Sequence, residues 1–592
     1  MLLACRMYIG RNIFKILAIY IGQSPIIIAK IQERRRACRC GGRAWNKRIA
    51  AMTLDLSQNT RQIKLRATSA LAMAMFEQTG LKELVDSRFE IDSRQKLTPG
   101  NGIKAFIGDM MGFEGRRAVS NVLNSFVSGP NDRLFGKKVT FESLGGRALS
   151  RNLDSLFEKD LSSLFYDCYR RITEHYGLDS KIFNVDSTNF GINALRKESD
   201  SPDAAVPERC GHAKDGHHER LVYSLLSVTD GNKVVCYERP YDGATADSVM
   251  DRGAVEFLAG KIDPKESVIT ADCKIATGPL IDLMYSKGFG FVAKCPRSFG
   301  KKIREDIVYS VSVGSMDPSA VRDGWEIYDT DAHVDGKKLR FVAYRTSEDI
   351  RAGVEYHRTQ GKKEAEALIE RFESKLYNCD VDAKRDLDEV LPLLEDYAFR
   401  VRWSIDPVEI SIGYGHSGRP RKDERPRMKT EYRVNILLEF DEEKAKGLSK
   451  DRGVSVLVTN LPRTNEDADN IRYGATADTV LLTYLNQYHV EHAFRLEKDG
   501  MGMSTVYIQK PSRENAMMFV ISLAAMLTDV ADHLFSKRGW AMTFPNLVEK
   551  VKMLDLICDP IRRTEYLDGS DECIGLFMKA IDILGIDPDR LV

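Results

Sequence analysis

Two short apolar runs, each ending at an aspartate, place the strongest constraint on the fold of this chain. Residues 182–190 read IFNVDSTNF and contain Asp186, and residues 267–272 read SVITAD and end in Asp272. Short runs rich in β-branched residues predict buried strands, and a polar turn residue marks where such a strand ends. Each aspartate therefore terminates a predicted strand, an arrangement that α/β proteins also use for purely structural reasons.

The chain around these runs alternates between strand-like and helix-like segments. RLVYSLLSVTD and KVVCYERPY, joined by an Asp-Gly-Asn turn, follow the first run, so residues 182–241 predict three consecutive strands in an antiparallel meander. A helix is expected over 246–258, followed by the strand that ends in Asp272, a helix over 277–287 and the strand GFVAKC. This combination predicts an α/β fold with a ribonuclease-H-like mixed sheet and flanking helices.

A third acidic residue lies in the segment YLNQYHVEHAFRLEK, residues 484–498. Tyr484, Glu491 and Lys498 are seven residues apart, which on one continuous helix would place them on nearly the same face. Arg495 would lie beside them. A carboxylate among cations and aromatic rings suits an enzyme that acts on a nucleic-acid backbone; the alternative is an amphipathic helix with a solvated charged stripe.

The three carboxylates together predict a metal-dependent site. Mg²⁺ prefers oxygen ligands, and two such ions about 4 Å apart can activate a water or a 3′ hydroxyl and stabilise the leaving oxygen. Asp186, Asp272 and Glu491 are therefore the candidate catalytic residues. They are also the candidate ligands of two Mg²⁺ ions, for which Mn²⁺ would substitute. The reaction expected of such a site is in-line phosphoryl transfer.

These segments resemble the DDE transposases of bacterial insertion sequences, of the insertion-sequence-four type. The family signature around the last acid is Y-x2-R-x3-E-x6-K, and its four positions hold, in this chain, Tyr484, Gln487, Glu491 and Lys498. Glutamine thus stands where the family has a basic residue. DSTNFGIN resembles the segment of the first aspartate, ERPYDGATADS the strand and loop that follow, and ITADCK the segment of the second aspartate.

The resemblance implies a transposase that cuts at the terminal inverted repeats of an insertion sequence and joins the 3′ ends to target DNA. It implies that Glu491 completes the metal site, that Lys498 contacts a phosphate near the cleaved bond, and that Tyr484 contacts the flanking strand. Arg495 would supply the charge that Gln487 lacks. The implied partners are double-stranded DNA and a second copy of the chain, as a homodimer on DNA, in the bacterial cytoplasm at the nucleoid.

Two alternatives to an active transposase stay open. A ribonuclease-H-like DNA nuclease would share the acidic residues but would release cut DNA without strand transfer. A catalytically decayed copy would bind DNA without cutting it, and the departure at Gln487 favours this alternative.

Composition and periodicity divide the chain into five parts. Residues 1–51 carry 11 Lys or Arg against one acid, and this break predicts an extension, non-native or disordered, with translation beginning at Met52. Residues 52–175 are expected to form an α-helical N-terminal domain that is a candidate for DNA binding, and residues 176–300 the first part of the ribonuclease-H-like core. Residues 301–465 are expected to be a β-rich insertion. Residues 466–592 are expected to form the second part of the core, with the Glu491 helix and C-terminal helices. Within the insertion, strand-like pieces surround one charged helical stretch, GKKEAEALIERFESKL.

The insertion also contains the segment YGHSGRPRKDERPRMK, residues 414–429. From Arg419 to Lys429 it holds six cations against two acids, and its Gly-Arg-Pro resembles the core of an AT-hook, whose extended arginine enters a narrow minor groove. Because the net charge of the whole chain is only +1, DNA binding requires local patches of this kind. Arg419 is the candidate DNA contact; the alternative is a solvated hairpin loop.

The expected compartment is reducing. The eleven cysteines include no Cys-x-x-Cys pair and form no evident disulfide framework. The apolar runs near the N-terminus are interrupted at Lys15, Gln23, Pro25 and Lys30, before they reach the 18 or so apolar residues of a membrane span. No membrane partner is therefore expected.

Overall fold

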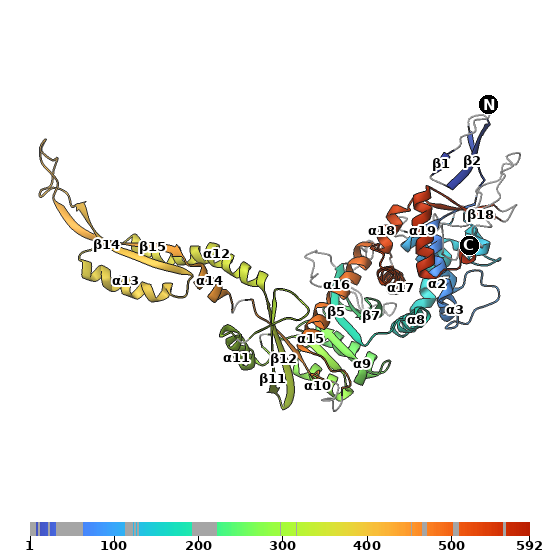
Figure 1. The fold of residues 1–592 in the computed structure, drawn as a ribbon, viewed down its shortest axis with the longest axis horizontal. Helices are drawn as coiled ribbons and strands as arrows, with labels where there is room; N and C mark the ends of the chain where they lie inside the picture. Colours follow the sequence, from blue (N-terminus) through green and yellow to red (C-terminus); the bar gives the residue numbers. More distant parts are fainter. Residues whose placement is uncertain are drawn as a thin grey trace. The chain divides into compact units, whose positions relative to one another are not determined.

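The structure is a computed structural model that describes most of the chain (Figure 1). The residues described are 7–9, 12–21, 24–30, 63–112, 122, 126, 129–191, 222–296, 298–314, 316–450, 453–464, 471–500, 508, 510–559 and 564–591. They divide into two compact units. Unit 1 comprises Met1–Ile275, Leu283–Phe289 and Leu485–Val592, and unit 2 comprises Ala276–Asp282 and Gly290–Tyr484.

Helices dominate the N-terminal part of unit 1. They are α2 (Ala67–Gln78), α3 (Leu81–Asp86), α4 (Pro99–Met111), α6 (Asn131–Leu134), α7 (Gly146–Phe157) and α8 (Leu161–Tyr176). Local sequence explains their ends. The Thr98 side chain accepts a hydrogen bond from the Asn101 amide at the start of α4, and Asp160 caps α8 in the same way. Gly177 ends α8 in the left-handed conformation that glycine adopts without strain.

The core of unit 1 is built around α17 (Pro511–Lys537). This helix packs against α4, α7, α8 and α19 (Asp571–Leu584). Within the part of the chain that the structure describes, α17 alone is long and apolar enough to cross a membrane, but its most apolar stretch is 89% buried. Such burial is typical of the core helix of a soluble protein. The remaining helix of this region is α18 (Phe544–Lys550).

Four strands of a large mixed sheet belong to unit 1. They run in the order β8-β5-β6-β7, with bounds β5 (Ile182–Gly191), β6 (Val222–Asp230), β7 (Val235–Asp242) and β8 (Val268–Ala271). The pairs β5–β6 and β6–β7 are antiparallel, which confirms the predicted meander, whereas β5 and β8 are parallel. The predicted helices are present as α9 (Asp247–Ala259) and α10 (Gly278–Lys287). The mixed α/β class is therefore confirmed.

Two small antiparallel sheets complete unit 1. One has the order β18-β17-β4, and it joins β4 (Ile63–Arg66) to β17 (Asp555–Asp559) and β18 (Thr564–Asp568). The other contains β1 (Met7–Ile9), β2 (Asn12–Ile21) and β3 (Ser24–Lys30), in a stretch for which we predicted no element. The start of translation at Met52 lies outside the described residues and stays a prediction.

In unit 2, five strands of the large sheet follow the order β10-β11-β12-β16-β9, all antiparallel. Their bounds are β9 (Gly290–Lys294), β10 (Asp317–Pro318), β11 (Trp325–Val334), β12 (Lys337–Thr346) and β16 (Ser455–Thr459). The helix α15 (Ala477–Leu485) follows them, and its last residue lies at the start of the next segment of unit 1.

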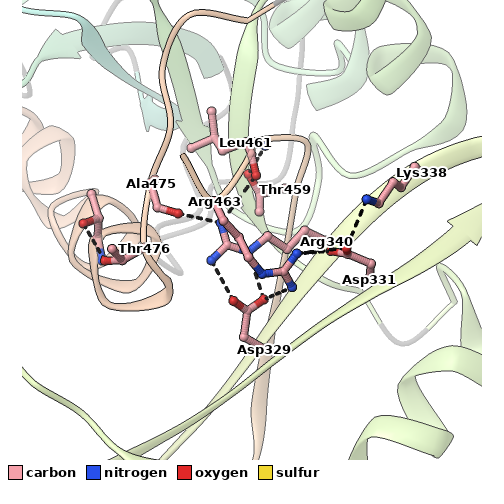
Figure 2. Close-up of polar contacts among 10 residues, drawn as sticks. Asp329, Asp331, Lys338, Arg340, Thr459, Leu461, Arg463, Ala475 and Thr476 are labelled. Carbon is pink, nitrogen blue, oxygen red and sulfur yellow. Dashed lines mark hydrogen bonds and ion pairs between the residues drawn. The ribbon is translucent and has the colours of Figure 1, made fainter. Parts of the chain in front are cut away.

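An ion-pair network joins β11, β12 and the segment after β16 (Figure 2). Arg340 is only 4% exposed, donates two hydrogen bonds to Asp329 at 2.8 and 2.9 Å, and donates to the carbonyls of Leu461 and Ala475. Arg463 pairs with Asp329 and with Asp331 from the solvent side. A planar guanidinium is suited to this fork of carboxylate and carbonyl acceptors.

Replacing Arg340 by alanine is expected to destabilise unit 2 by about 3 kcal/mol, because it leaves two buried carbonyls and part of Asp329 without a donor. Arg463→Ala removes a more exposed partner of the same network, and we expect a loss of about 1 kcal/mol. Urea denaturation of both variants measures the difference. Equal losses of unfolding free energy in the two variants would show that the network does not depend on the buried Arg340 more than on Arg463.

The rest of unit 2 contains more helix than the sequence indicated. Its elements are α11 (Lys301–Ser312), α12 (Ser347–Glu373), β13 (Leu376–Tyr377), α13 (Asp380–Leu394), β14 (Phe399–Ser411), β15 (Met428–Phe440) and α14 (Glu442–Ser449). The prediction of a single charged helix in this region is wrong. In α13, the residues Ala383, Leu387, Val390 and Leu394 recur at helical spacing and are buried against β14 and β15. Those two strands and β13 form a sheet of order β13-β15-β14.

Candidate functional site

Asp186 and Asp272 lie next to each other at one edge of the sheet in unit 1. The parallel pairing of β5 and β8 sets Val185 opposite Ala271. Asp186 follows within β5, which continues to Gly191, and Asp272 directly follows the last residue of β8. The prediction that Asp186 ends its strand is therefore wrong. Neighbouring strands are about 4.8 Å apart. The sheet register therefore brings together two acidic residues that are more than eighty positions apart in the sequence.

Local turns orient both carboxylates. The Ser187 amide donates to Asp186 Oδ1 at 2.7 Å, and the Lys274 amide donates to Asp272 Oδ1 at 2.8 Å. A backbone N–H that donates to a carboxylate oxygen holds that carboxylate in one orientation. Both side chains are partly exposed, so their remaining oxygens are accessible from this edge.

The helix α9 adds two further acidic residues to this edge. Asp247 accepts a hydrogen bond from Ser187 Oγ at 2.7 Å and pairs with Lys274 Nζ at 2.8 Å. Asp251, one turn further on, is 5% exposed, and burial raises its pKa to about 7, with further increases from Asp247, Asp272 and Asp186. We call Asp186, Asp247, Asp251 and Asp272 the acidic edge.

Only part of the acidic edge was predicted from the sequence. Asp247 stands in the segment that resembled the family's Gly-x-x-x-Asp loop, but Asp251 was not recognised. The available signal was the spacing of these two residues, four apart at the start of a predicted helix, which places both on one helical face.

The continuous helix predicted over 484–498 is wrong. Helix α15 ends at Leu485, a turn follows, and α16 begins at Tyr488 and ends at Arg495. At the turn the His489 amide donates to the Asn486 carbonyl and the Val490 amide to the Gln487 carbonyl, three residues back instead of four. This tighter hydrogen bonding interrupts the α-helical repeat.

The break changes where the four signature residues lie. Tyr484 belongs to α15 and unit 2, whereas Gln487 precedes α16 as its N-cap in unit 1. Glu491 lies on α16, and Lys498 lies in a π-helical turn, η4 (Leu496–Gly500). The interval of seven residues therefore does not place Tyr484, Glu491 and Lys498 on one helical face.

Helix α16 packs against β5 and β6, the strands beside the acidic edge. His489, Val490, Ala493 and Phe494 are its buried residues. The exposed face carries Glu491 with the residues Tyr488, His492 and Arg495. Lys233 lies 5.9 Å from the centre of the Tyr488 ring, and burial, then Arg495 and Lys233, lower the pKa of His492. Glu491 therefore shares its exposed face with Tyr488 and Arg495, whereas Tyr484 and Lys498, which were predicted to lie on the same face, belong to other segments.

Lys498 is anchored to the strand that carries Asp186. Its Nζ donates to Thr188 Oγ1 at 2.8 Å and to the Asn189 carbonyl at 2.6 Å. These acceptors are two and three residues beyond Asp186 on β5. The cation is thus positioned near the acidic edge by the strand itself.

Two buried glutamates, Glu238 and Glu497, lie close to each other in unit 1. Glu238 on β7 is 7% exposed and accepts a hydrogen bond from Ser227 Oγ at 2.7 Å, and Glu497 on η4 is 1% exposed. The two carboxyl groups interact directly with each other. Burial, and then the charge of Glu238, raises the pKa of Glu497 well above its usual range.

The structure assembles the predicted site only in part. Among the residues that it describes, no three His, Cys, Asp or Glu side chains form a group that could hold a metal ion. Asp186 and Asp272 are brought together, whereas Glu491 is placed on the neighbouring helix and Arg419 lies in unit 2. The metal triad thus stays a prediction. Its donor set fits Mg²⁺ in chemistry, because the acidic edge offers carboxylate oxygens.

The comparisons with known proteins concern the N-terminal helices. Residues 62–169 match the model of a family described as a domain of unknown function, DUF4277, which is common in transposase-like proteins. The match includes β4 and the helices from α2 into α8 and ends before Asp186. No curated protein matches the chain.

Proposed function

We propose that this chain is a DNA transposase of the DDE type with a ribonuclease-H-like core. The observation that supports this most strongly is the parallel register that sets Asp186, within β5, beside Asp272, which directly follows β8. The domain match at 62–169 points to the same class of protein. On this proposal the enzyme cuts at the terminal inverted repeats of an insertion sequence and joins the 3′ ends to target DNA, in the bacterial cytoplasm and as a dimer on DNA.

The proposed metal ligands are Asp186, Asp272 and Glu491. Two Mg²⁺ ions, when bound, supply charge stabilisation and lower the pKa of the attacking water or 3′ hydroxyl. The chain's own groups orient the ligands: Ser187 and Lys274 fix the two aspartates and Asp247. Tyr488 and Arg495 flank Glu491 and would bind the DNA strand, and Lys498 would bind a phosphate next to Asp186.

The test uses the full chain, a labelled DNA fragment that carries the ends of its element, and Mg²⁺ or Mn²⁺. We expect metal-dependent cutting and joining, both lost in Glu491→Ala. Cutting without joined products would indicate a nuclease instead. Specific binding to the ends without cutting, by the native chain and the variant alike, would contradict the proposal and favour a decayed copy, which the glutamine at Gln487 supports.

A further inference from the structure

The loop that joins β14 to β15 in unit 2 carries a concentrated positive charge. Its residues 412–427 include five cations, all with exposed side chains: Arg419, Arg421, Lys422, Arg425 and Arg427. We call these residues the hairpin tip. It holds only two acids, Asp423 and Glu424.

In the part of the chain that the structure describes, cations along the two strands form ion pairs with acidic residues, whereas the cations of the hairpin tip do not. On the strands, Arg400 pairs with Asp441 and Arg402 with Glu439, at 2.8 and 3.0 Å. Within the described residues, none of the five tip cations forms an ion pair with a carboxylate. Their charge is therefore available to a partner that is itself anionic.

One of the two tip acids is already engaged inside the loop. Glu424 accepts hydrogen bonds from the ring of His416 at 2.9 Å and from the Arg421 amide at 3.0 Å. The strand pairing also continues into the loop, because the Ile412 amide donates to the Arg427 carbonyl and the Arg427 amide to the Gly413 carbonyl. Gly413 has a φ of 88°, which favours glycine at this turn. The loop backbone is thus held by its own hydrogen bonds.

The base of the hairpin is packed against two helices. β14 and β15 pair over thirteen residues each, and α12 and α13 pack against them around a cluster that includes Leu387, Leu394, Phe399 and Val434 (Figure 1). Presenting cations on a packed hairpin lowers the entropy that must be lost when a partner binds. This arrangement suits a contact that must hold a repetitive, highly charged ligand.

We propose that the hairpin tip binds the phosphate backbone of double-stranded DNA, without reading its sequence. Four of its five cations are arginines, whose planar guanidinium groups bind phosphate oxygens in pairs. Phosphate contacts of this kind give affinity and position but carry no sequence information. The inference rests on the proposed function, since it takes DNA as the substrate, and it adds a binding surface in unit 2 to the acidic edge in unit 1.

The test compares two variants of the full chain that lose the same charge. The tip variant carries Arg419→Gln, Arg421→Gln, Lys422→Gln and Arg425→Gln. The control variant replaces four cations of α12 and α13 that already lie within 4.0 Å of an acid, in the form Arg351→Gln, Arg358→Gln, Lys362→Gln and Lys384→Gln. Binding to a duplex that lacks the element's ends is measured at several salt concentrations.

Each lost phosphate contact reduces the slope of log K against log salt by about 0.9, so we expect a reduction of about 3 to 4 in the tip variant and almost none in the control. Equal changes in both variants, or an unchanged slope in the tip variant, would overturn the inference. Loss of binding to vesicles with anionic lipid, with duplex binding intact, would also overturn it. DNA cleavage by the native chain is measured in a separate assay. An absence of cleavage would count against the proposed function, whereas an unchanged salt slope in the tip variant would count against DNA binding by the hairpin tip.

Discussion

Asp272→Asn is expected to abolish DNA cutting and joining while leaving the fold intact. The asparagine Oδ1 can still accept the hydrogen bond from the Lys274 amide, so the turn after β8 is retained. The charge that a divalent cation requires is lost. If this removes about 4 kcal/mol of transition-state stabilisation, the rate falls about a thousandfold. Gel analysis of labelled ends in Mg²⁺ measures the loss.

Asp263→Asn is the matched control for this change. Asp263 is exposed and caps a short turn by accepting a hydrogen bond from the Lys265 amide, and it precedes β8 instead of following it. We expect cutting by this variant at the native rate. Cutting by Asp272→Asn within tenfold of the native rate would contradict the assignment of Asp272 as a metal ligand.

Glu497→Gln is expected to make the stability of unit 1 less dependent on pH. The pKa of Glu497 is raised in the folded state, so the neutral carboxyl contributes stability that is full below its unfolded pKa, near 4.5. This stability is lost as the pH rises towards the folded pKa. Glutamine is neutral at every pH and has a similar shape, so the variant avoids the loss.

Thermal unfolding at about pH 5 and pH 8 measures this effect. A tenfold difference in proton affinity between the folded and unfolded chains corresponds to about 1.4 kcal/mol, and each kcal/mol changes Tm by about 2 °C or more. We expect the native Tm to fall further than the variant's over this interval. Glu256→Gln, at an exposed position of α9, is the control and should follow the native chain. A variant whose Tm falls as far as that of the native chain would contradict this prediction.

The parts of the fold that were predicted from sequence depend on neighbouring residues. β5 and β8 follow from short apolar runs, the position of Asp272 directly after β8 follows from the end of its run, and the meander follows from its turn. The break between α15 and α16 was not predicted, because Asn486 and Gln487 are compatible with an uninterrupted helical pattern. The second helix packs against β5 and β6, contacts that its own sequence does not reveal.

The missed members of the site depend on contacts between distant segments. Aspartate is usually a surface residue, so the sequence predicts an exposed Asp251. The structure instead buries Asp251 on α9, close to the acidic residues of β5 and of the turn after β8. Glu497 lies in the charged segment RLEKDG, for which the sequence likewise predicts an exposed side chain. In both cases a buried carboxyl lies close to other acids, and burial raises its pKa.

The π-helical turn from Leu496 to Gly500 has a consequence for the geometry of the cation that follows Glu491. In a π-helix the amide bonds to the carbonyl five residues back, so the turn contains one residue more than an α-helical turn. One extra residue corresponds to a rotation of about 100° around the axis. Lys498 is therefore directed to Thr188 and Asn189 instead of lying in line with Glu491. The π-helical turn thus carries an ammonium group whose two hydrogen-bond acceptors lie on β5.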